Sequence, residues 1–128
     1  MQPISILVAD DDSHIRQCLH RALEIDEQLQ VKWEAENGLQ ALVLAAQYHP
    51  DVVLLDAEMP RMDGFEAARC LRQRCSKVRI VIMSVYEEAR AQALEAGANA
   101  FLVKDCGCTE LRSMLHRVLR EGTLALQK

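Results

Sequence analysis

Short apolar segments alternate along the chain with segments whose apolar residues recur at helical spacing. Residues 4–9 are apolar and rich in β-branched side chains, which is typical of a buried strand. The next segment, 13–25, places Ile15, Leu19, Ala22 and Leu23 at the i, i+4, i+7, i+8 positions of one helical face. The alternation continues and predicts further strands at 31–36, 52–55, 79–83 and 101–103, with helices at 39–48, 65–74, 87–96 and 110–121.

Turn and capping residues stand at the boundaries of these segments. Asn37-Gly38 and Asp63-Gly64 are turn signals before two of the helices, and Gly97 is placed to stop a third. Asp12 is interpreted as the cap of the first helix, and Thr109 as the cap of the last. The turn and capping residues and the spacing of apolar residues therefore both indicate five strand–helix repeats.

The strands are short and nearly all apolar, which indicates a parallel sheet buried on both faces. We predict an α/β protein with a three-layer, doubly wound, flavodoxin-like fold: a five-stranded parallel sheet of order 2-1-3-4-5 with five helices. With 128 residues, the chain is expected to form a single domain over 1–128. In such sheets ligands bind beyond the carboxyl ends of the strands, near the switch point between the first and third strands.

Composition narrows the function classes. Half of the residues are hydrophobic, but no apolar run approaches the roughly 20 residues that span a bilayer, so no membrane association is expected. The N-terminus has no basic segment before an apolar run, and no secretory signal is expected. A net charge of −4 disfavours direct nucleic-acid binding.

Five cysteines, at irregular spacing, favour reduced thiols and a cytoplasmic location. Cys106-Gly107-Cys108 lacks the second half of a zinc-binding set, and we expect free thiols there.

Polar residues follow the predicted strands at the same end. Asp10, Asp11 and Asp12 follow the first strand, Asp56 the third, Ser84 the fourth and Lys104 the fifth. Alone, each aspartate reads as a turn or cap residue and the lysine as a surface side chain. Because parallel strands end at one edge of a sheet, we expect these residues to form a single site.

Several crowded carboxylates repel one another unless a cation neutralises them, and Mg²⁺ is the usual hard ion for oxygen ligands. A carboxylate held beside Mg²⁺ and a lysine suits in-line attack on phosphorus, because both cations offset charge on the transferring phosphoryl oxygens. The hydroxyl of Ser84 can donate a hydrogen bond to one of those oxygens. The predicted product is an acyl phosphate on aspartate.

Four motifs resemble those of response-regulator receiver domains of two-component systems, the CheY-like superfamily. They cover nearly the whole chain in order, and the Asp-x-x-Met-Pro-x-Met-Asp-Gly stretch is highly specific. The motifs are 6–12 (Ile-Leu-Val-Ala-Asp-Asp-Asp), 54–64 (Leu-Leu-Asp-Ala-Glu-Met-Pro-Arg-Met-Asp-Gly), 81–84 (Val-Ile-Met-Ser) and 97–104 (Gly-Ala-Asn-Ala-Phe-Leu-Val-Lys).

The resemblance implies a role for each matching residue. Asp56 would accept the phosphoryl group and also bind the metal. Asp11 would be a direct Mg²⁺ ligand and Asp10 an indirect one, while Glu58 would offer its backbone carbonyl to the ion. Lys104 would pair with the phosphoryl group.

The resemblance also implies a conformational switch and partners. Ser84 and Phe101 would form the switch pair, in which the hydroxyl moves to the phosphoryl oxygen and the ring turns inward. The donor would be the phosphohistidine of a sensor histidine kinase or phosphotransfer protein, or a small phosphodonor, and phosphorylation could produce a homodimer.

Asp105 stands where the family usually has proline, and Lys104-Asp105 is similar to receivers of the NarL/FixJ type. That similarity favours the input part of a longer regulator with a helix-turn-helix DNA-binding domain and control of transcription. The alternative is a stand-alone regulator that acts by protein–protein contact. The cognate kinase, the stimulus and the oligomeric state stay open.

Parts of the sequence also fit two other function classes. Asp10-x-Asp12 after an apolar strand also fits the nucleophile motif of haloacid-dehalogenase-type phosphatases, in which Asp10 attacks and Asp12 is the general acid, but this leaves the Asp56 stretch unexplained. The chain could also be a receiver-like interaction module that is no longer phosphorylated, yet the acceptor, the lysine and the acidic residues are all present. We therefore expect a phospho-accepting signalling domain that catalyses only its own phosphorylation and dephosphorylation.

Glu58 and Tyr86 are expected to border the path of water to the phosphoryl group. Glu58 could orient a water molecule or repel the anionic phosphoryl group, whereas the bulk of Tyr86 could shield the phosphoryl group from water. We expect shielding to dominate and the phosphorylated form to be long-lived.

Overall fold

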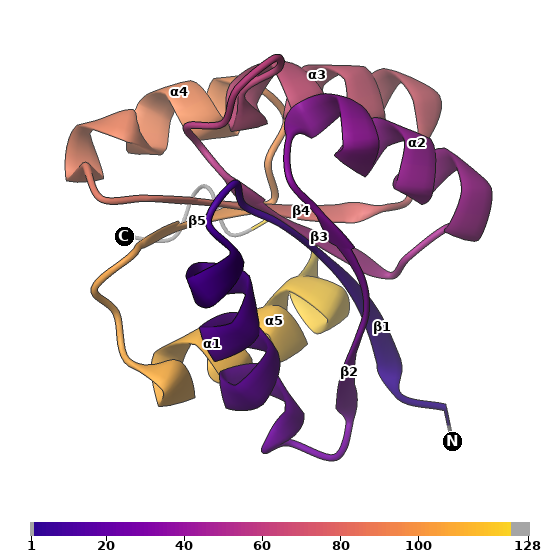
Figure 1. Ribbon diagram of the computed structural model, residues 1–128, viewed down its shortest axis with the longest axis vertical. Coiled ribbons are helices and arrows are strands. Elements are labelled where there is room, and N and C mark those ends of the chain that lie inside the picture. The colour runs from indigo at the N-terminus through magenta and orange to yellow at the C-terminus, as the bar shows by residue number, and fades with distance from the viewer. Residues whose placement is uncertain (1, 124–128) are drawn as a thin grey trace.

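The computed structural model describes residues 2–123 and contains one parallel sheet of order β2-β1-β3-β4-β5 between two helical layers (Figure 1). The predicted strand order and fold class are confirmed. The elements in chain order are β1 (Ile4–Ala9), α1 (Ser13–Glu24), β2 (Leu29–Ala35), α2 (Gly38–Tyr48), β3 (Val52–Asp56), α3 (Gly64–Arg74), β4 (Arg79–Ser84), the 3₁₀ turn η1 (Glu87–Ala89), α4 (Arg90–Glu95), β5 (Ala100–Val103) and α5 (Cys108–Glu121).

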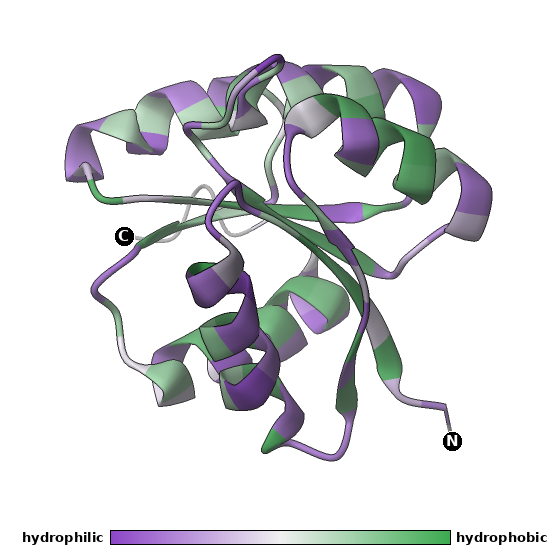
Figure 2. Cartoon of the chain, in the orientation of Figure 1, coloured by the Kyte–Doolittle hydropathy of each residue, from purple (hydrophilic) through white to green (hydrophobic). Residues whose placement is uncertain are grey.

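The inner strands send alternate side chains into two separate cores, whereas the edge strand β2 exposes Gln30, Lys32 and Glu34. In β1, Leu7 and Ala9 pack on the side of α2, α3 and α4, whereas Ile6 and Val8 pack on the side of α1 and α5. This is the period-two alternation of a pleated strand, and the strands at the centre of the sheet are coloured mainly as hydrophobic (Figure 2). The centre of the sheet is therefore covered on both faces, and the polar groups of β3 lie at its carboxyl end.

Aspartate and asparagine caps start the first three helices. The carboxylate of Asp12 accepts hydrogen bonds from the backbone N–H groups of residues 14 and 15, so its predicted capping role is confirmed. Asn37 and Asp63 cap α2 and α3 in the same way. These side chains replace the missing partners of the first amide groups.

Two glycines allow helices to approach the strand ends closely. A Cβ atom at Gly64 would collide with the backbone oxygen of Asp56, and one at Gly38 would collide with the backbone oxygen of Met62. The N–H of Gly38 donates to that same oxygen at 3.0 Å, which ties the start of α2 to the loop after β3. The Asp-Gly and Asn-Gly pairs are thus close contacts as well as turns.

Three predictions differ from the structure by more than a one-residue shift of a boundary. β2 begins at Leu29, before the predicted 31, because pairing with β1 extends the strand. The single helix predicted over 87–96 is a 3₁₀ turn followed by a short α-helix, with no side-chain cap at either start. Thr109 lies inside α5, which begins at Cys108 with Gly107 in the capping position. In contrast, Gly97 and Gly122 follow α4 and α5 with positive φ, as predicted for helix stops.

Among residues 2–123, no helix is both long and apolar enough to cross a membrane.

Candidate functional site

The sheet register brings the predicted site residues to one edge. Ala9 of β1 pairs with Leu55 of β3, so the next residues along, Asp10 and Asp56, emerge side by side at the switch point. Asp56 pairs with Met83, which directly precedes Ser84. Parallel pairing thus places the ends of β1, β3 and β4 together.

Lys104 connects two of these strand ends. Its Nζ atom lies 3.0 Å from Oδ1 of Asp56 and 3.2 Å from Oδ2 of Asp10. Both carboxylates are almost fully buried, at 2% exposure for Asp10 and 7% for Asp56. One ammonium group therefore contacts two buried anions, with geometry suited to charge-assisted hydrogen bonds.

Asp11 completes an acidic cluster with these two residues. One carboxylate oxygen from each of Asp10, Asp11 and Asp56 lies within 4.8 Å of the other two. Asp11 is exposed, so the cluster opens to solvent on its side. Three carboxylates facing one lysine leave a net negative charge, and oxygen donors in this arrangement fit a hard divalent cation.

Asp10 is held by one contact to its side chain and one to its backbone. Its Oδ1 accepts a hydrogen bond from the N–H of Asp12 at 2.9 Å, and its carbonyl accepts one from Arg16 at 2.6 Å. Arg16 also forms an ion pair with Glu34 at 2.9 Å. Arg16 was not among the predicted site residues. Its place one turn after the aspartates puts a basic side chain near them but does not determine which way that side chain points.

Burial raises the pKa of Asp56 above its ordinary value. The hydrogen bond from Lys104 opposes this effect, and the charge of Asp10 adds to it. For Lys104, burial lowers the pKa, but the hydrogen bond to Asp56 and the charges of Asp56 and Asp10 outweigh it, and the pKa is raised. The lysine is therefore an ammonium at neutral pH, and ionised Asp56 is costly until more positive charge is present.

Ser84 and Phe101 lie on the same side of the sheet. Phe101 pairs with Ile82, two residues before Ser84, and side chains two apart on a strand share a face. The Ser84 hydroxyl accepts a hydrogen bond from the N–H of Tyr86 at 3.0 Å. Phe101 is buried, and the guanidinium of Arg90 lies 5.1 Å from its ring centre. The ring thus occupies the inward position.

Glu58 and Tyr86 both have solvent-exposed side chains, and the Tyr86 backbone contacts the site through its N–H hydrogen bond to Ser84. Glu58 lies with Asp11 on the wall of a depression of about 560 Å³ formed by the loop after β3. The N–H of Glu58 approaches Oδ1 of Asp56 at 3.4 Å. Asp12 is absent from the acidic cluster because its carboxylate caps α1.

The class of protein follows from these features: a doubly wound α/β domain with an acidic, lysine-bridged site at its switch point. The sequence model of the response regulator receiver domain matches residues 6–116, and the chain belongs to that family. This assignment leaves no basis for the phosphatase alternative centred on Asp10 and Asp12.

Known relatives agree with this assignment. The chain is 36% identical to the nitrate/nitrite response regulator protein NarL of Escherichia coli K12 over 91% of its own length. It is 31% identical to the transcriptional regulatory protein DegU of Brevibacillus brevis over 93% of its length. The chain spans about half the length of these curated relatives, 55% and 51%.

Solved structures give the same result. The signal receiver domain of NarL from Mycobacterium tuberculosis superposes with a TM-score of 0.89 at 32% identity, covering 94% of this chain and 99% of that one. A LuxR-family response regulator from Aurantimonas superposes with a TM-score of 0.87 at 29% identity, covering 93% and 86%. The chain is thus a receiver domain of the NarL/LuxR type.

The raised pKa of Asp56 generates a stability prediction. The native state binds this proton more tightly than the unfolded state, so the stabilisation from protonation is complete below the ordinary value near 3.8 and is lost as the pH rises through the raised value. Asp56→Asn removes the ionisable group and should raise the free energy of unfolding at pH 7 in metal-free buffer. The gain should shrink as the pH falls toward 4. Urea unfolding at several pH values measures it.

The exposed Asp105→Asn is the matched control and should show no such pH-dependent gain. A wild type that equals or exceeds Asp56→Asn in stability at pH 7 would contradict the assignment of burial as the dominant effect on Asp56.

Proposed function

We propose that this chain is the phospho-accepting input domain of a response regulator and that Asp56 takes a phosphoryl group from the phosphohistidine of a sensor histidine kinase or phosphotransfer protein. The observation that carries the proposal is the contact of the Lys104 ammonium with the buried carboxylate of Asp56, at 3.0 Å, beside two further carboxylates. The family assignment supports it.

In the proposed reaction a carboxylate oxygen of Asp56 attacks phosphorus in line with the phosphohistidine nitrogen. The P–N bond breaks, the donor imidazole leaves with the bond's electron pair and is protonated, and an acyl phosphate remains on Asp56. Lys104 is placed to offset charge on a phosphoryl oxygen while it still contacts Asp10. The same residues would support phosphorylation by a small phosphodonor and later hydrolysis.

The acidic cluster fits Mg²⁺. Asp11, Asp56 and the backbone carbonyl of Glu58 would hold the ion, with Asp10 acting indirectly. When bound, Mg²⁺ would offset the negative charge of the transferring phosphoryl group. The donor set supports this assignment, because the three carboxylates lie beside a single ammonium group, that of Lys104, which contacts Asp10 and Asp56.

We further propose that phosphorylation shifts this domain between two conformers through Ser84 and Phe101. The output would be transcription, through a DNA-binding domain outside this chain, with a homodimer as one form of the active state. The partial coverage of longer transcriptional regulators supports this proposal. A stand-alone regulator is the alternative, and full gene length distinguishes the two. Five free thiols support a reducing, cytoplasmic setting.

Phosphorylation itself is the direct test. With Mg²⁺ and acetyl phosphate, the protein should gain one phosphoryl group, seen as a mass increase of the intact chain. Asp56→Asn should abolish the gain, and a chelator should stop the reaction in the wild type. Asp12→Asn is the matched control, because Asp12 caps α1 outside the acidic cluster, and it should be labelled normally. Wild-type labelling of Asp56→Asn would refute the assignment.

Ser84→Ala should still accept the phosphoryl group but respond weakly. Its hydroxyl accepts from the N–H of Tyr86 and donates no hydrogen bond within residues 2–123, so its proton is available to a phosphoryl oxygen. Loss of that charge-assisted bond should cost the coupling roughly 1.5–3 kcal/mol. Amide chemical shifts of α4 and β5, with and without beryllofluoride, measure the response. Ser84→Thr keeps the hydroxyl and is the control, and a full response in Ser84→Ala would refute the role.

Tyr86→Ala should shorten the lifetime of the phosphorylated form. Hydrolysis needs a water in line with the leaving carboxylate, and the exposed ring of Tyr86 is near enough in sequence to Ser84 to cover that approach. Decay of the phosphorylated mass should accelerate several-fold, where tenfold corresponds to about 1.4 kcal/mol of barrier. Tyr86→Phe keeps the bulk and should decay at the wild-type rate. Unchanged or slower decay in Tyr86→Ala would show that the ring does not shield.

A further inference from the structure

Helix α2 presents an apolar face that the proposed function does not use. Its sequence, Gly38–Tyr48, contains no charged residue. Leu39 and Val43 are 43% and 63% exposed, and Ala46 is exposed as well. These three residues have the i, i+4, i+7 spacing of one helical stripe. The stripe faces away from the core, where Ala41 and Ala45 of the same helix are buried.

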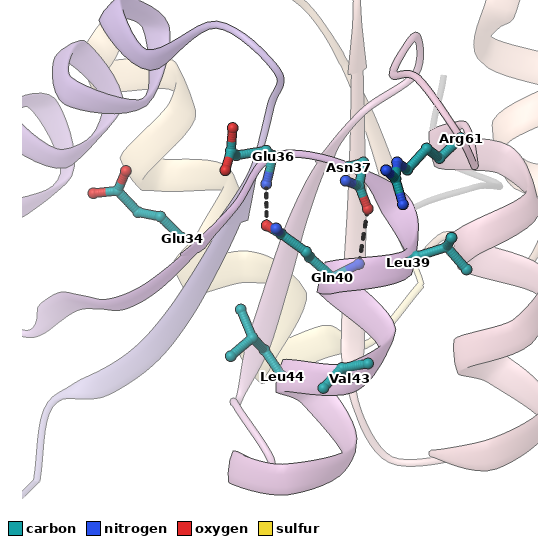
Figure 3. A pocket seen from close by; sticks show the side chains of 8 residues that line it. All are labelled: Glu34, Glu36, Asn37, Leu39, Gln40, Val43, Leu44 and Arg61. Atoms are coloured by element: carbon teal, nitrogen blue, oxygen red, sulfur yellow. Dashed lines mark hydrogen bonds between the residues drawn. The ribbon is translucent and has the colours of Figure 1, made fainter.

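Opposite charges flank the N-terminal end of this stripe. Glu36 lies on one side of α2 and Arg61 on the other, above the apolar side chains (Figure 3). Both side chains line the same depression, which has a volume of about 730 Å³. Within residues 2–123 neither Glu36 nor Arg61 has an ion-pair partner, whereas the neighbouring Glu34 is paired with Arg16. One free acid and one free base therefore border a single apolar surface.

The position of Arg61 is fixed by the loop that carries it. Its φ of 68° lies in the left-handed region, which is unfavourable for a residue other than glycine. The next residue, Met62, is held against the start of α2 by the hydrogen bond from the N–H of Gly38. Arg61 therefore stands at a set place beside α2 and does not belong to a free loop tip.

We propose that the α2 face is a self-association surface: a second copy of this chain docks there, with Glu36 of each copy against Arg61 of the other. Homodimers usually have a two-fold axis, so the surface must be complementary to itself. A surface that carries an acid and a base on opposite flanks of an apolar stripe meets that condition, because each copy supplies both halves of both ion pairs.

The charges also select the orientation of the two copies. An axis parallel to α2 exchanges the two flanks at the same height, which brings Glu36 over Arg61 twice and Val43 over the apolar stripe of the other copy. An axis across α2 would place the start of one helix over the end of the other and leave both charges unpaired. The proposed dimer therefore has parallel α2 helices.

The surface is one helix wide, so the dimer should be weak and reversible compared with permanent homodimers, which bury larger apolar areas. The test is sedimentation equilibrium of the full chain from micromolar to millimolar concentration, in metal-free buffer without phosphodonor. Its outcome is therefore independent of phosphorylation at Asp56. The wild type should show a concentration-dependent dimer, which Val43→Asp should abolish with the circular dichroism spectrum unchanged.

Charge reversal identifies the contact. Glu36→Arg and Arg61→Glu should each weaken the dimer at least tenfold, because each places like charges together twice. An equimolar mixture of the two variants should form a heterodimer at wild-type strength, since both contacts again join opposite charges, one pair with its original sign and one with the sign reversed. The double variant should also recover. Arg21→Glu and Glu27→Arg make the same charge changes at exposed positions on α1 and after it, and should dimerise normally.

Three results would overturn the proposal: a monomer at every concentration, a dimer insensitive to reversal of Glu36 and Arg61, or failure of the mixture to associate. A monomer that instead gains a partner through this face, such as the remainder of a longer regulator, would also overturn it, because the occupant proposed is a second copy.

Discussion

The contact of one lysine ammonium with two buried carboxylates is the interaction on which the rest of the site depends. Asp10, Asp56 and Lys104 come from three different strands, and each would be costly to bury alone. These three residues meet because parallel pairing ends β1, β3 and β5 at one edge of the sheet. The strands that carry them are almost entirely apolar up to that edge. The sheet thus brings the carboxylates of Asp10 and Asp56 to a place where the Lys104 ammonium can partly neutralise them.

The compensation is incomplete, which gives the site its chemical character. Two buried anions and the exposed Asp11 lie together beside one ammonium group, so further positive charge should be favourable at this edge. The raised pKa of Asp56 has a related origin, because binding a proton removes the negative charge of a buried carboxylate. A fully neutralised cluster would be more stable but would have less affinity for a metal ion and an incoming phosphoryl donor. This balance between stability and reactivity is common at functional sites.

Much of the fold was predictable from sequence because local signals and long-range packing agree. The apolar strands, the Asp12 cap and the stops at Gly97 and Gly122 follow from rules that act within a few residues. Where no local signal dominates, prediction failed: Thr109 has the chemistry of a cap but lies inside α5, and residues 87–96 lack a cap that would enforce one continuous helix. The gathering of Asp10, Asp56 and Lys104 was predictable from topology. The reach of Arg16 to the carbonyl of Asp10 was not, because side-chain direction depends on how α1 packs against the sheet.

The hydrogen bond from Gly38 to Met62 joins two regions that the sequence separates by more than twenty residues. The oxygen it uses belongs to the loop that begins at the end of β3 and carries Glu58, so the start of α2 and the rim of the acidic site share one piece of backbone. Coupling between two binding sites is reciprocal. If binding at α2 favours one position of this loop, it changes the affinity of the acidic site for an ion or phosphoryl group by some factor. Binding of that ion or group then changes the affinity at α2 by the same factor. Under that condition, a binding event at the surface helix would also change the affinity of the acidic site for its ion or phosphoryl group.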